Sequence, residues 1–286
     1  MLVGSAPSEL KLGTTTVTGV RRGAGLIYDS DVAAFQKASG ATQVGPILAL
    51  VDYLKAESLW DYARFYPMKS SQNTGSGSTV YGLGGLTSNN MTLVNSPTWG
   101  SDGLTFASAS SQYGNIGDIF NGGDLTIFAR VAFSSATPTA NEAFSGAYSG
   151  STDERSFIFR RSGNVAGDPF TVVRSSLGTG ETVESYDSTD HIPTDAEECI
   201  VAQWLESNSR AIWQNKSPLA ISLTAGSNAT STYDANLDVY FAANNNGGPA
   251  AQYADFDAAC LMFITGASSA PTTTQRETIT DLINAL

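Results

Sequence analysis

The strongest constraint on the fold is a series of short segments, rich in β-branched and aromatic residues, that fills the sequence from about residue 80 onward. The segments recur at roughly 8–14 residue spacing and are separated by Gly, Asn, Asp and Ser, which is typical of antiparallel strands joined by tight turns. We therefore expect an antiparallel sandwich or barrel with strands at 91–95, 103–107, 111–116, 124–133, 142–148, 155–161, 169–175, 182–187, 198–205, 209–215, 219–223, 236–242 and 255–264.

The clearest hairpin lies in the second half of this series. The run CIVAQW is followed by LESNSRAIWQNK, and Asn208 with Ser209 predicts the tight turn between the two arms. Trp204 and Trp213 fall on opposite arms, which indicates core or cross-strand aromatics.

The first 66 residues follow a different pattern. Alternation within 10–20 predicts a short strand, after which the run 29–31 offers a helix N-cap and Gly40 suits the position just past the helix end. Helical spacing of apolar residues predicts a second helix over 46–57 and a short third one from Ser58 through Phe65. A helical unit this small cannot bury its apolar stripes without a partner.

The chain is expected to divide near residue 75, within the polar Gly- and Ser-rich stretch 69–79. Residues 1–75 then form an N-terminal anchoring or assembly region of short strands and two to three helices, and residues 76–286 form the β-sandwich with a C-terminal helix. That helix is expected over 272–286, where Thr274 and Glu277 fit a capping box.

Charge excludes two classes of partner. The formal net charge is -12, and residues 76–286 hold eight basic and 21 acidic residues. Without a basic cluster the chain lacks the counter-charge that nucleic acid or an anionic membrane surface requires. We also expect no membrane insertion, because no run of about 18 apolar residues occurs, and no secretory signal in MLVGSAPSEL.

Cys199 and Cys260 both lie in apolar, strand-like runs. We expect buried free thiols, with a single disulfide between facing strands as the alternative.

Residues 99–133, WGSDGLTFASASSQYGNIGDIFNGGDLTIFARVAF, resemble the opening of a concanavalin A-like lectin/glucanase domain of the laminin-G-like kind. Residues 198–215 are similar to the central hairpin of that family, residues 237–264 to its closing strand pair, and residues 272–286 to its short C-terminal helix. The resemblance implies a mainly β fold, an antiparallel jelly-roll β-sandwich, preceded here by an N-terminal strand plus small helical unit and closed by a C-terminal helix.

The N-terminal run LKLGTTTVTGVRRGAGLIYDSDVAAF resembles the start of tail or other virion proteins of bacterial viruses. This implies a bacteriophage structural protein exposed on the particle as a head decoration, head fibre or tail component and assembled in the host cytoplasm. Its N-terminal region would dock onto other virion proteins while the acidic sandwich projects outward. Such proteins are homo-oligomers, commonly trimers, and some contact host-surface glycans.

Catalytic patterns are missing from the sequence, so we expect no enzyme. His191 is the single histidine and sits among acidic turn residues, and no G-x-S-x-G elbow occurs. The glucanases that share the resemblance carry an E-x-D-x-E or E-x-D-x-x-E strand, whereas Glu181, Glu184 and Asp187 have the wrong order and spacing. One His and two isolated Cys do not make a zinc site.

Binding remains open to two interpretations, and no cofactor is expected in either. A glycan site could use Tyr148, Tyr253 and the Asn run 244–246, although such residues also form turns and strand edges. Calcium is a weaker alternative, with Asp153, Asp187, Asp190 and the same run, Asn244, Asn245 and Asn246, as oxygen ligands. The alternatives to a virion protein are a carbohydrate-binding, lectin-like module and a cell-surface adhesin.

Overall fold

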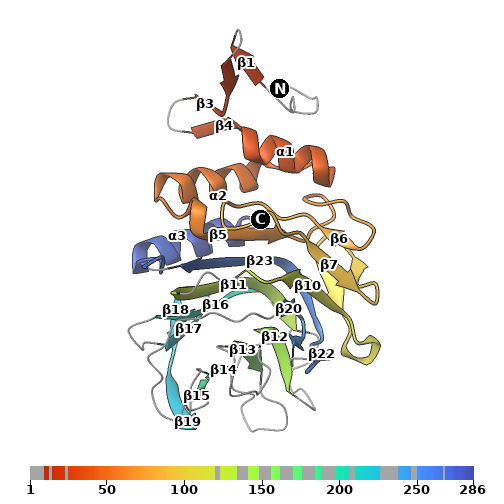
Figure 1. The fold of residues 1–286 in the computed structure, drawn as a ribbon, viewed down its shortest axis with the longest axis vertical. Coiled ribbons are helices and arrows are strands. Elements are labelled where there is room, and N and C mark those ends of the chain that lie inside the picture. The colour runs from red at the N-terminus through yellow and green to blue at the C-terminus, as the bar shows by residue number, and fades with distance from the viewer. Residues whose placement is uncertain are drawn as a thin grey trace.

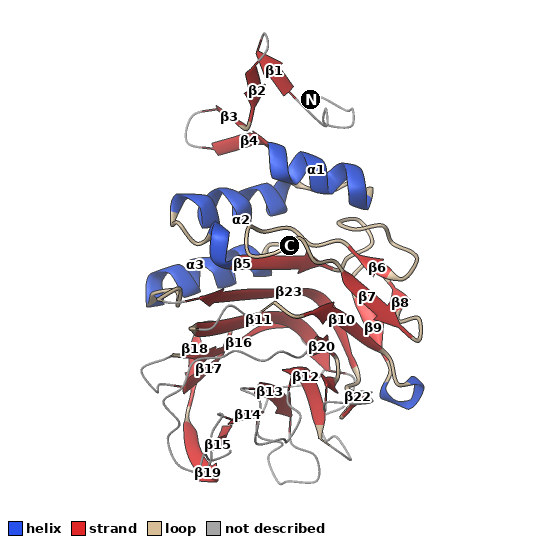
Figure 2. Ribbon diagram, in the orientation of Figure 1, coloured by secondary structure: helices blue, strands red, loops and turns tan. Residues whose placement is uncertain are grey.

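A computed structural model describes the chain at residues 10–12, 15–22, 25–119, 123–133, 141–147, 156–161, 170–175, 184–188, 197–205, 210–225, 238–245, 250–266 and 268–286. Figure 1 shows stacked layers: two N-terminal ribbons, a layer of helices, and two β-sheets packed face to face. Figure 2 shows that the α-helices lie on one side of the sheets.

The N-terminal ribbons are β-hairpins that precede the helices. Their strands are β1 Leu10–Leu12 with β2 Thr15–Val17, and β3 Gly19–Arg22 with β4 Gly25–Asp29. Helix α1, Ser30–Ser39, begins where the Asp29 carboxylate accepts hydrogen bonds from two backbone N–H groups, and it ends at Gly40 with φ 69°. Helix α2 is Gly45–Ala56 with Pro46 in its first turn.

The eight-stranded sheet lies directly under the helices. Its strand order is β18-β17-β16-β11-β23-β9-β8, and β5 also pairs with β23. The strands are β5 Ala63–Pro67, β8 Thr98–Trp99, β9 Leu104–Phe106, β11 Asp124–Phe133, β16 Glu198–Trp204, β17 Arg210–Gln214, β18 Ser217–Leu219 and β23 Phe256–Gly266.

The eleven-stranded sheet forms the far layer. Its main order is β19-β15-β14-β13-β12-β20-β10-β7-β6, with β21 and β22 attached beside β12. The strands are β6 Thr79–Val80, β7 Met91–Val94, β10 Tyr113–Gly117, β12 Glu142–Ala147, β13 Ser156–Arg161, β14 Phe170–Ser175, β15 Glu184–Ser188, β19 Ile221–Ala225, β20 Val239–Phe241, β21 Asn244–Asn245 and β22 Ala250–Ala251.

Two hydrophobic cores explain why the central strands are apolar on both faces. Between the sheets, alternate residues of β11 such as Leu125 and Ile127 pack with Trp204 and Phe241. On the other face, Phe128 packs with α1, α2 and the C-terminal helix α3, Thr273–Asn284. The apolar stripes of the N-terminal helices, which have no partner within their own segment, are therefore buried on the outer face of the eight-stranded sheet. The two sheets together form a jelly-roll-like β-sandwich, as expected.

The structure corrects two local predictions. The expected third helix is a single 3-10 turn, Trp60–Tyr62, and the residues after it form β5, because they pair with Cys260–Ile264 of β23. The capping box of α3 uses Thr272 and Gln275 rather than Thr274 and Glu277. The expected division at residue 75 stays a prediction, with the qualification that β5 is part of the sandwich.

Two other predictions, the paired arms of the hairpin and the free thiols, are confirmed. Strands β16 and β17 pair antiparallel, with Trp204 fully buried and Trp213 in the helix-facing core. The turn expected at Asn208 and Ser209 lies outside the described residues. Cys199 and Cys260 are buried free thiols. Both face Arg130 of β11 from opposite sides, so a whole strand lies between them, too far for a disulfide. In the described part of the chain, no helix is long and apolar enough to cross a membrane.

Candidate functional site

Three tyrosines gather on the outer face of the eleven-stranded sheet. The ring centroids of Tyr113 and Tyr240 are 4.7 Å apart, and those of Tyr113 and Tyr253 are 6.1 Å apart. Alternation along the strands sends Ile116 and Phe241 into the inter-sheet core, so Tyr113 and Tyr240 point away from it and stay half-buried. We call Tyr113, Tyr240 and Tyr253 the tyrosine patch.

A polar hollow of about 330 Å³ adjoins this patch, and we call it the amide hollow. Asn115 joins the two, because it is the cross-strand partner of Tyr240 and lies two residues after Tyr113 on the same face. The Nδ2 of Asn115 donates to the Oδ2 of Asp238 at 3.0 Å. The hollow is lined by Asn89, Asn90, Thr92, Asn115, Ile116, Gly117 and Asp238.

A β-bulge shapes the floor of the amide hollow. The register of β10 against β20 shifts between Asn115 and Gly117, and Gly117 has φ 80°, a conformation that favours glycine. The backbone N–H of Gly117 donates to the Oδ1 of Asn115 at 2.8 Å. With both of its polar ends engaged, the Asn115 amide has a fixed orientation toward the hollow.

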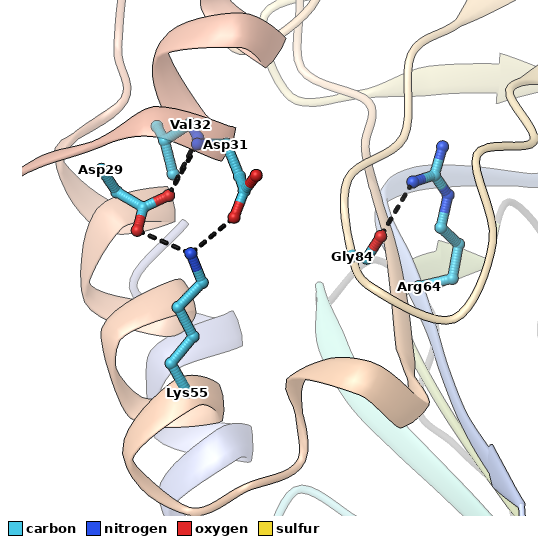
Figure 3. A network of polar contacts seen from close by, with 6 residues as sticks. All are labelled: Asp29, Asp31, Val32, Lys55, Arg64 and Gly84. Carbon is cyan, nitrogen blue, oxygen red and sulfur yellow. Dashed lines mark hydrogen bonds and ion pairs between the residues drawn. The ribbon is translucent and has the colours of Figure 1, made fainter. Parts of the chain in front are cut away.

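The rim of the hollow is held from below by a buried arginine. Arg64 of β5 donates to the backbone oxygen of Asn89 through Nε at 3.0 Å and Nη2 at 2.6 Å, and to Gly84 through Nη1 at 3.4 Å. The Tyr66 hydroxyl donates to the same Asn89 oxygen at 3.1 Å. Figure 3 shows Arg64 reaching the Gly84 carbonyl of the loop. The loop that carries Asn89 and Asn90 is thereby tied to the eight-stranded sheet.

Burial dominates the ionisation of these supporting groups. It lowers the pKa of the Arg64 guanidinium, which Tyr66 partly opposes, and it raises the pKa of Tyr66 to about 12. Burial also raises the pKa of Tyr240, with Tyr113 and Asp238 adding to the shift. All the tyrosine hydroxyls described here that show a shift are therefore neutral hydrogen-bonding groups near pH 7.

This arrangement suits a polyhydroxylated ligand. Aromatic faces pack against apolar C–H surfaces, and amide and carboxylate groups accept and donate the hydrogen bonds that hydroxyls offer. Within the described lining, the amide hollow supplies three side-chain amides and one carboxylate beside the tyrosine patch. Hydrogen-bonding groups and aromatic faces therefore lie side by side at this site.

The structure separates the residues expected at a glycan site. Tyr253 belongs to the tyrosine patch. Asn244 and Asn245 are not in an exposed loop as expected: they form β21, are 1% and 6% exposed, and pair in parallel with β12. Tyr148 and Asn246 lie outside the described residues.

The calcium candidates remain untested. Asp153 and Asp190 lie outside the described residues, as does His191, and Asp187 lies in β15, where side chains are not described. Among the described residues, no group of three or more His, Cys, Asp or Glu side chains is arranged to hold a metal ion.

Sequence reasoning missed Tyr113, Asn115, Asp238 and Tyr240. The signal was present as alternation, because Tyr113 and Asn115 share one face of β10 and Tyr240 is two residues after Asp238. What the sequence does not reveal is that β10 and β20 are neighbours.

A second hollow, of about 520 Å³, lies at the junction of the N-terminal ribbons and the helices. The Lys55 ammonium bridges Asp29 at 2.7 Å and Asp31 at 2.6 Å (Figure 3). It also lies 4.6 Å from the centroid of the Trp60 ring. Burial lowers the pKa of Lys55, but the two aspartates outweigh it and raise the pKa overall. The one ammonium of α2 is paired with two carboxylates at the start of α1, so we assign this network to fastening α1 onto α2.

No protein-family model matches the sequence, and no curated protein matches it. Among solved structures, a mutant of Trypanosoma rangeli sialidase displaying trans-sialidase activity has a TM-score of 0.52 at 11% identity, over 83% of this chain and 39% of that one. A complex of Trypanosoma rangeli sialidase with 2,3-difluorosialic acid has a TM-score of 0.51 at 10% identity, over 82% of this chain and 38% of that one. A CBM40 module of Ruminococcus gnavus IT-sialidase bound to α2,3-sialyllactose reaches only 0.40 at 12% identity, over 55% of this chain and 83% of that one.

The likeness to the sialidases concerns the fold. The chain spans about two fifths of the length of the sialidases it matches, at 10–11% identity. This fits the concanavalin A-like β-sandwich expected from the sequence and does not carry an activity across.

Proposed function

We propose that this chain is a non-catalytic carbohydrate-binding protein whose tyrosine patch and amide hollow form the glycan site. The observation that carries the proposal is the continuity of the two features on one sheet face: Tyr240 pairs with Asn115, and Asn115 is hydrogen-bonded to Asp238. A sugar ring lying over the tyrosines would present its hydroxyls to the amides.

The non-catalytic part of the proposal rests on the composition of the hollow. Most glycoside hydrolases place a pair of carboxylates about 5–9.5 Å apart across the scissile bond. The described lining of the amide hollow contains one carboxylate, that of Asp238. The amides beside it form hydrogen bonds but do not act as a general acid or base near pH 7. Within the described lining, the hollow therefore lacks the carboxylate pair on which most of these enzymes depend.

A glycan array followed by titration calorimetry on the hit tests the proposal. We expect Tyr240→Ala to weaken binding about tenfold, as loss of an aromatic platform does, and Asn115→Ala to weaken it similarly. Tyr62→Ala is the matched control, because Tyr62 is 39% exposed and lies outside the site. Absence of any glycan binding, or binding unchanged in Tyr240→Ala, would overturn the proposal, and hydrolysis of the bound glycan would overturn its non-catalytic part.

We propose secondly that the N-terminal ribbons attach the sandwich to a larger assembly. We take this assembly to be a virus particle that forms in the host cytoplasm and in which the chain is a homo-oligomer. The supporting observation is that β1–β2 and β3–β4 extend beyond the helical layer on the side away from the sheets (Figures 1 and 2). Isolated two-stranded ribbons are marginally stable in water and gain stability from a partner.

The test is removal of residues 1–22, which deletes β1, β2 and β3 and leaves β5 and the helices α1, α2 and α3 in place. The truncated chain should stay folded by circular dichroism but no longer join particles or oligomers in sedimentation. A truncated chain that still incorporates would refute the attachment role.

A further inference from the structure

We infer that the amide hollow selects uncharged sugars and discriminates against sugars that carry a carboxylate; this inference rests on the proposed glycan-binding function. The charges around the site carry it. The described lining contains the carboxylate of Asp238 and no basic side chain. The chain as a whole has a formal net charge of -12, so its wider field opposes an anionic ligand as well.

The Asp238 carboxylate is fixed at the hollow. Its Oδ2 accepts from Asn115 at 3.0 Å, and its backbone oxygen accepts from the Nδ2 of Asn245 at 2.8 Å. Asn245 is only 6% exposed and is itself held in β21. Asn245 is therefore a positioning residue: it anchors the chain at Asp238, which keeps the negative charge where a bound sugar would meet it.

The arginine beside the site is not placed to pair directly with a ligand carboxylate. Recognition of a carboxylate in proteins commonly uses the two-pronged guanidinium group of arginine. Arg64 lies under the rim, but it is 4% exposed, and its Nε, Nη1 and Nη2 are engaged with the backbone oxygens of Asn89 and Gly84. The guanidinium keeps its charge, but its fork is already occupied and buried, so it cannot make the two-pronged contact with a ligand carboxylate.

Neutral sugars match the remaining groups. A hydroxyl donates to the second oxygen of Asp238, an interaction with a charged acceptor that is stronger than one between neutral groups. The same carboxylate repels a ligand carboxylate. Across about 4 Å this repulsion lowers affinity about fivefold in bulk water and by more at the lower dielectric of a protein surface, so we expect discrimination of about tenfold or more at this open hollow.

The experiment compares matched probes on the full chain. An array carrying lactose beside α2,3-sialyllactose, together with other neutral and uronic-acid glycan pairs, identifies the bound class, and calorimetry then measures both members of the best pair. We expect the neutral member to bind about tenfold more tightly at low salt, and the ratio to fall as salt is raised. Asp238→Asn should reduce the ratio several-fold, whereas Asp102→Asn, an exposed carboxylate outside the hollow, should not.

The outcomes separate the two levels of the argument. Glycan binding that depends on Tyr240 but favours the carboxylate-bearing member, or an unchanged ratio in Asp238→Asn, would overturn the selectivity while leaving the glycan site standing. No binding of either member, with no loss in Tyr240→Ala, would overturn the proposed function itself.

Discussion

Replacing Arg64 with methionine should loosen the loop that carries the rim of the hollow. The guanidinium is buried and makes two good hydrogen bonds to the Asn89 oxygen and a longer one to Gly84. Hydrogen bonds from charged donors contribute about 1.5–3 kcal/mol each, but two of these share one acceptor, and Tyr66 continues to donate to it. We take about 3 kcal/mol as the loss before compensation.

Methionine recovers part of this loss because it fills a similar volume with apolar atoms and removes the desolvation of a buried charge. We therefore expect Arg64→Met to lower the free energy of unfolding by about 2 kcal/mol, or the melting temperature by about 4–8 °C for a chain of this size. Urea unfolding followed by tryptophan fluorescence measures the first, and calorimetry measures the second.

Two further variants make the result interpretable. Lys37→Met removes the same charge from an exposed position of α1 and should leave stability unchanged. Arg64→Lys keeps the buried charge but cannot bridge two carbonyl groups with a planar fork, so it should be at least as destabilised as Arg64→Met. If Arg64→Met melts within about 1 °C of the parent, desolvation cancels the hydrogen bonds and the arginine does not hold the rim.

Three other substitutions or conditions test the packing. Burial raises the pKa of Tyr66 to about 12 from an ordinary value of 10.0, so the stabilisation that its neutral hydroxyl gives is fully present below pH 10 and is lost as pH rises through 12. Tyr66→Phe should therefore flatten the fall of the free energy of unfolding between pH 10 and 12, and the same slope in the variant and the parent would contradict this. Burial also raises the pKa of the Cys199 and Cys260 thiols, so neither should react with a disulfide reagent until urea unfolds the chain, and rapid labelling of the folded protein would show the reasoning to be wrong. Gly84→Ala should lower the free energy of unfolding by about 3 kcal/mol or more, because Gly84 has φ +141° and the new Cβ would lie 2.1 Å from a backbone oxygen of β5. Gly77→Ala is the control for backbone strain alone, because Gly77 has a positive φ but open space around it, and it should lower the same free energy by about 1 kcal/mol.

Local patterns in the sequence predict most of the fold. The strand predicted at 124–133 matches β11, and Asp29 and Gly40 mark the ends of α1, because alternation, caps and turn residues act over a few neighbouring positions. The helix prediction was wrong for residues 63–65, because they become a strand only through pairing with β23, which lies far along the chain. Local propensity cannot report such a contact.

The candidate site was harder to predict for the same reason. Tyr113 and Tyr240 come from distant segments, and nothing in either segment says that they meet. Asn244 and Asn245 misled the prediction because runs of Asn usually form exposed turns, whereas here pairing with β12 buries them. Tyr253 was predicted because a glycan site is expected to use aromatic residues on loops, whereas Tyr113 and Tyr240 lie in strands and were not predicted.

The pairing of β5 with β23 also sets an order of events when the chain is made. A ribosome releases residues 63–67 long before residues 260–264, and α3, which covers the same face, follows later still. Until then the edge of β5 is unpaired and the apolar side chains of α2 stay exposed to solvent. Exposure of this kind during synthesis favours chaperone binding or aggregation. Final assembly of this sheet therefore awaits nearly the whole described sequence, and slow, post-translational folding is the expected consequence of so many distant pairings.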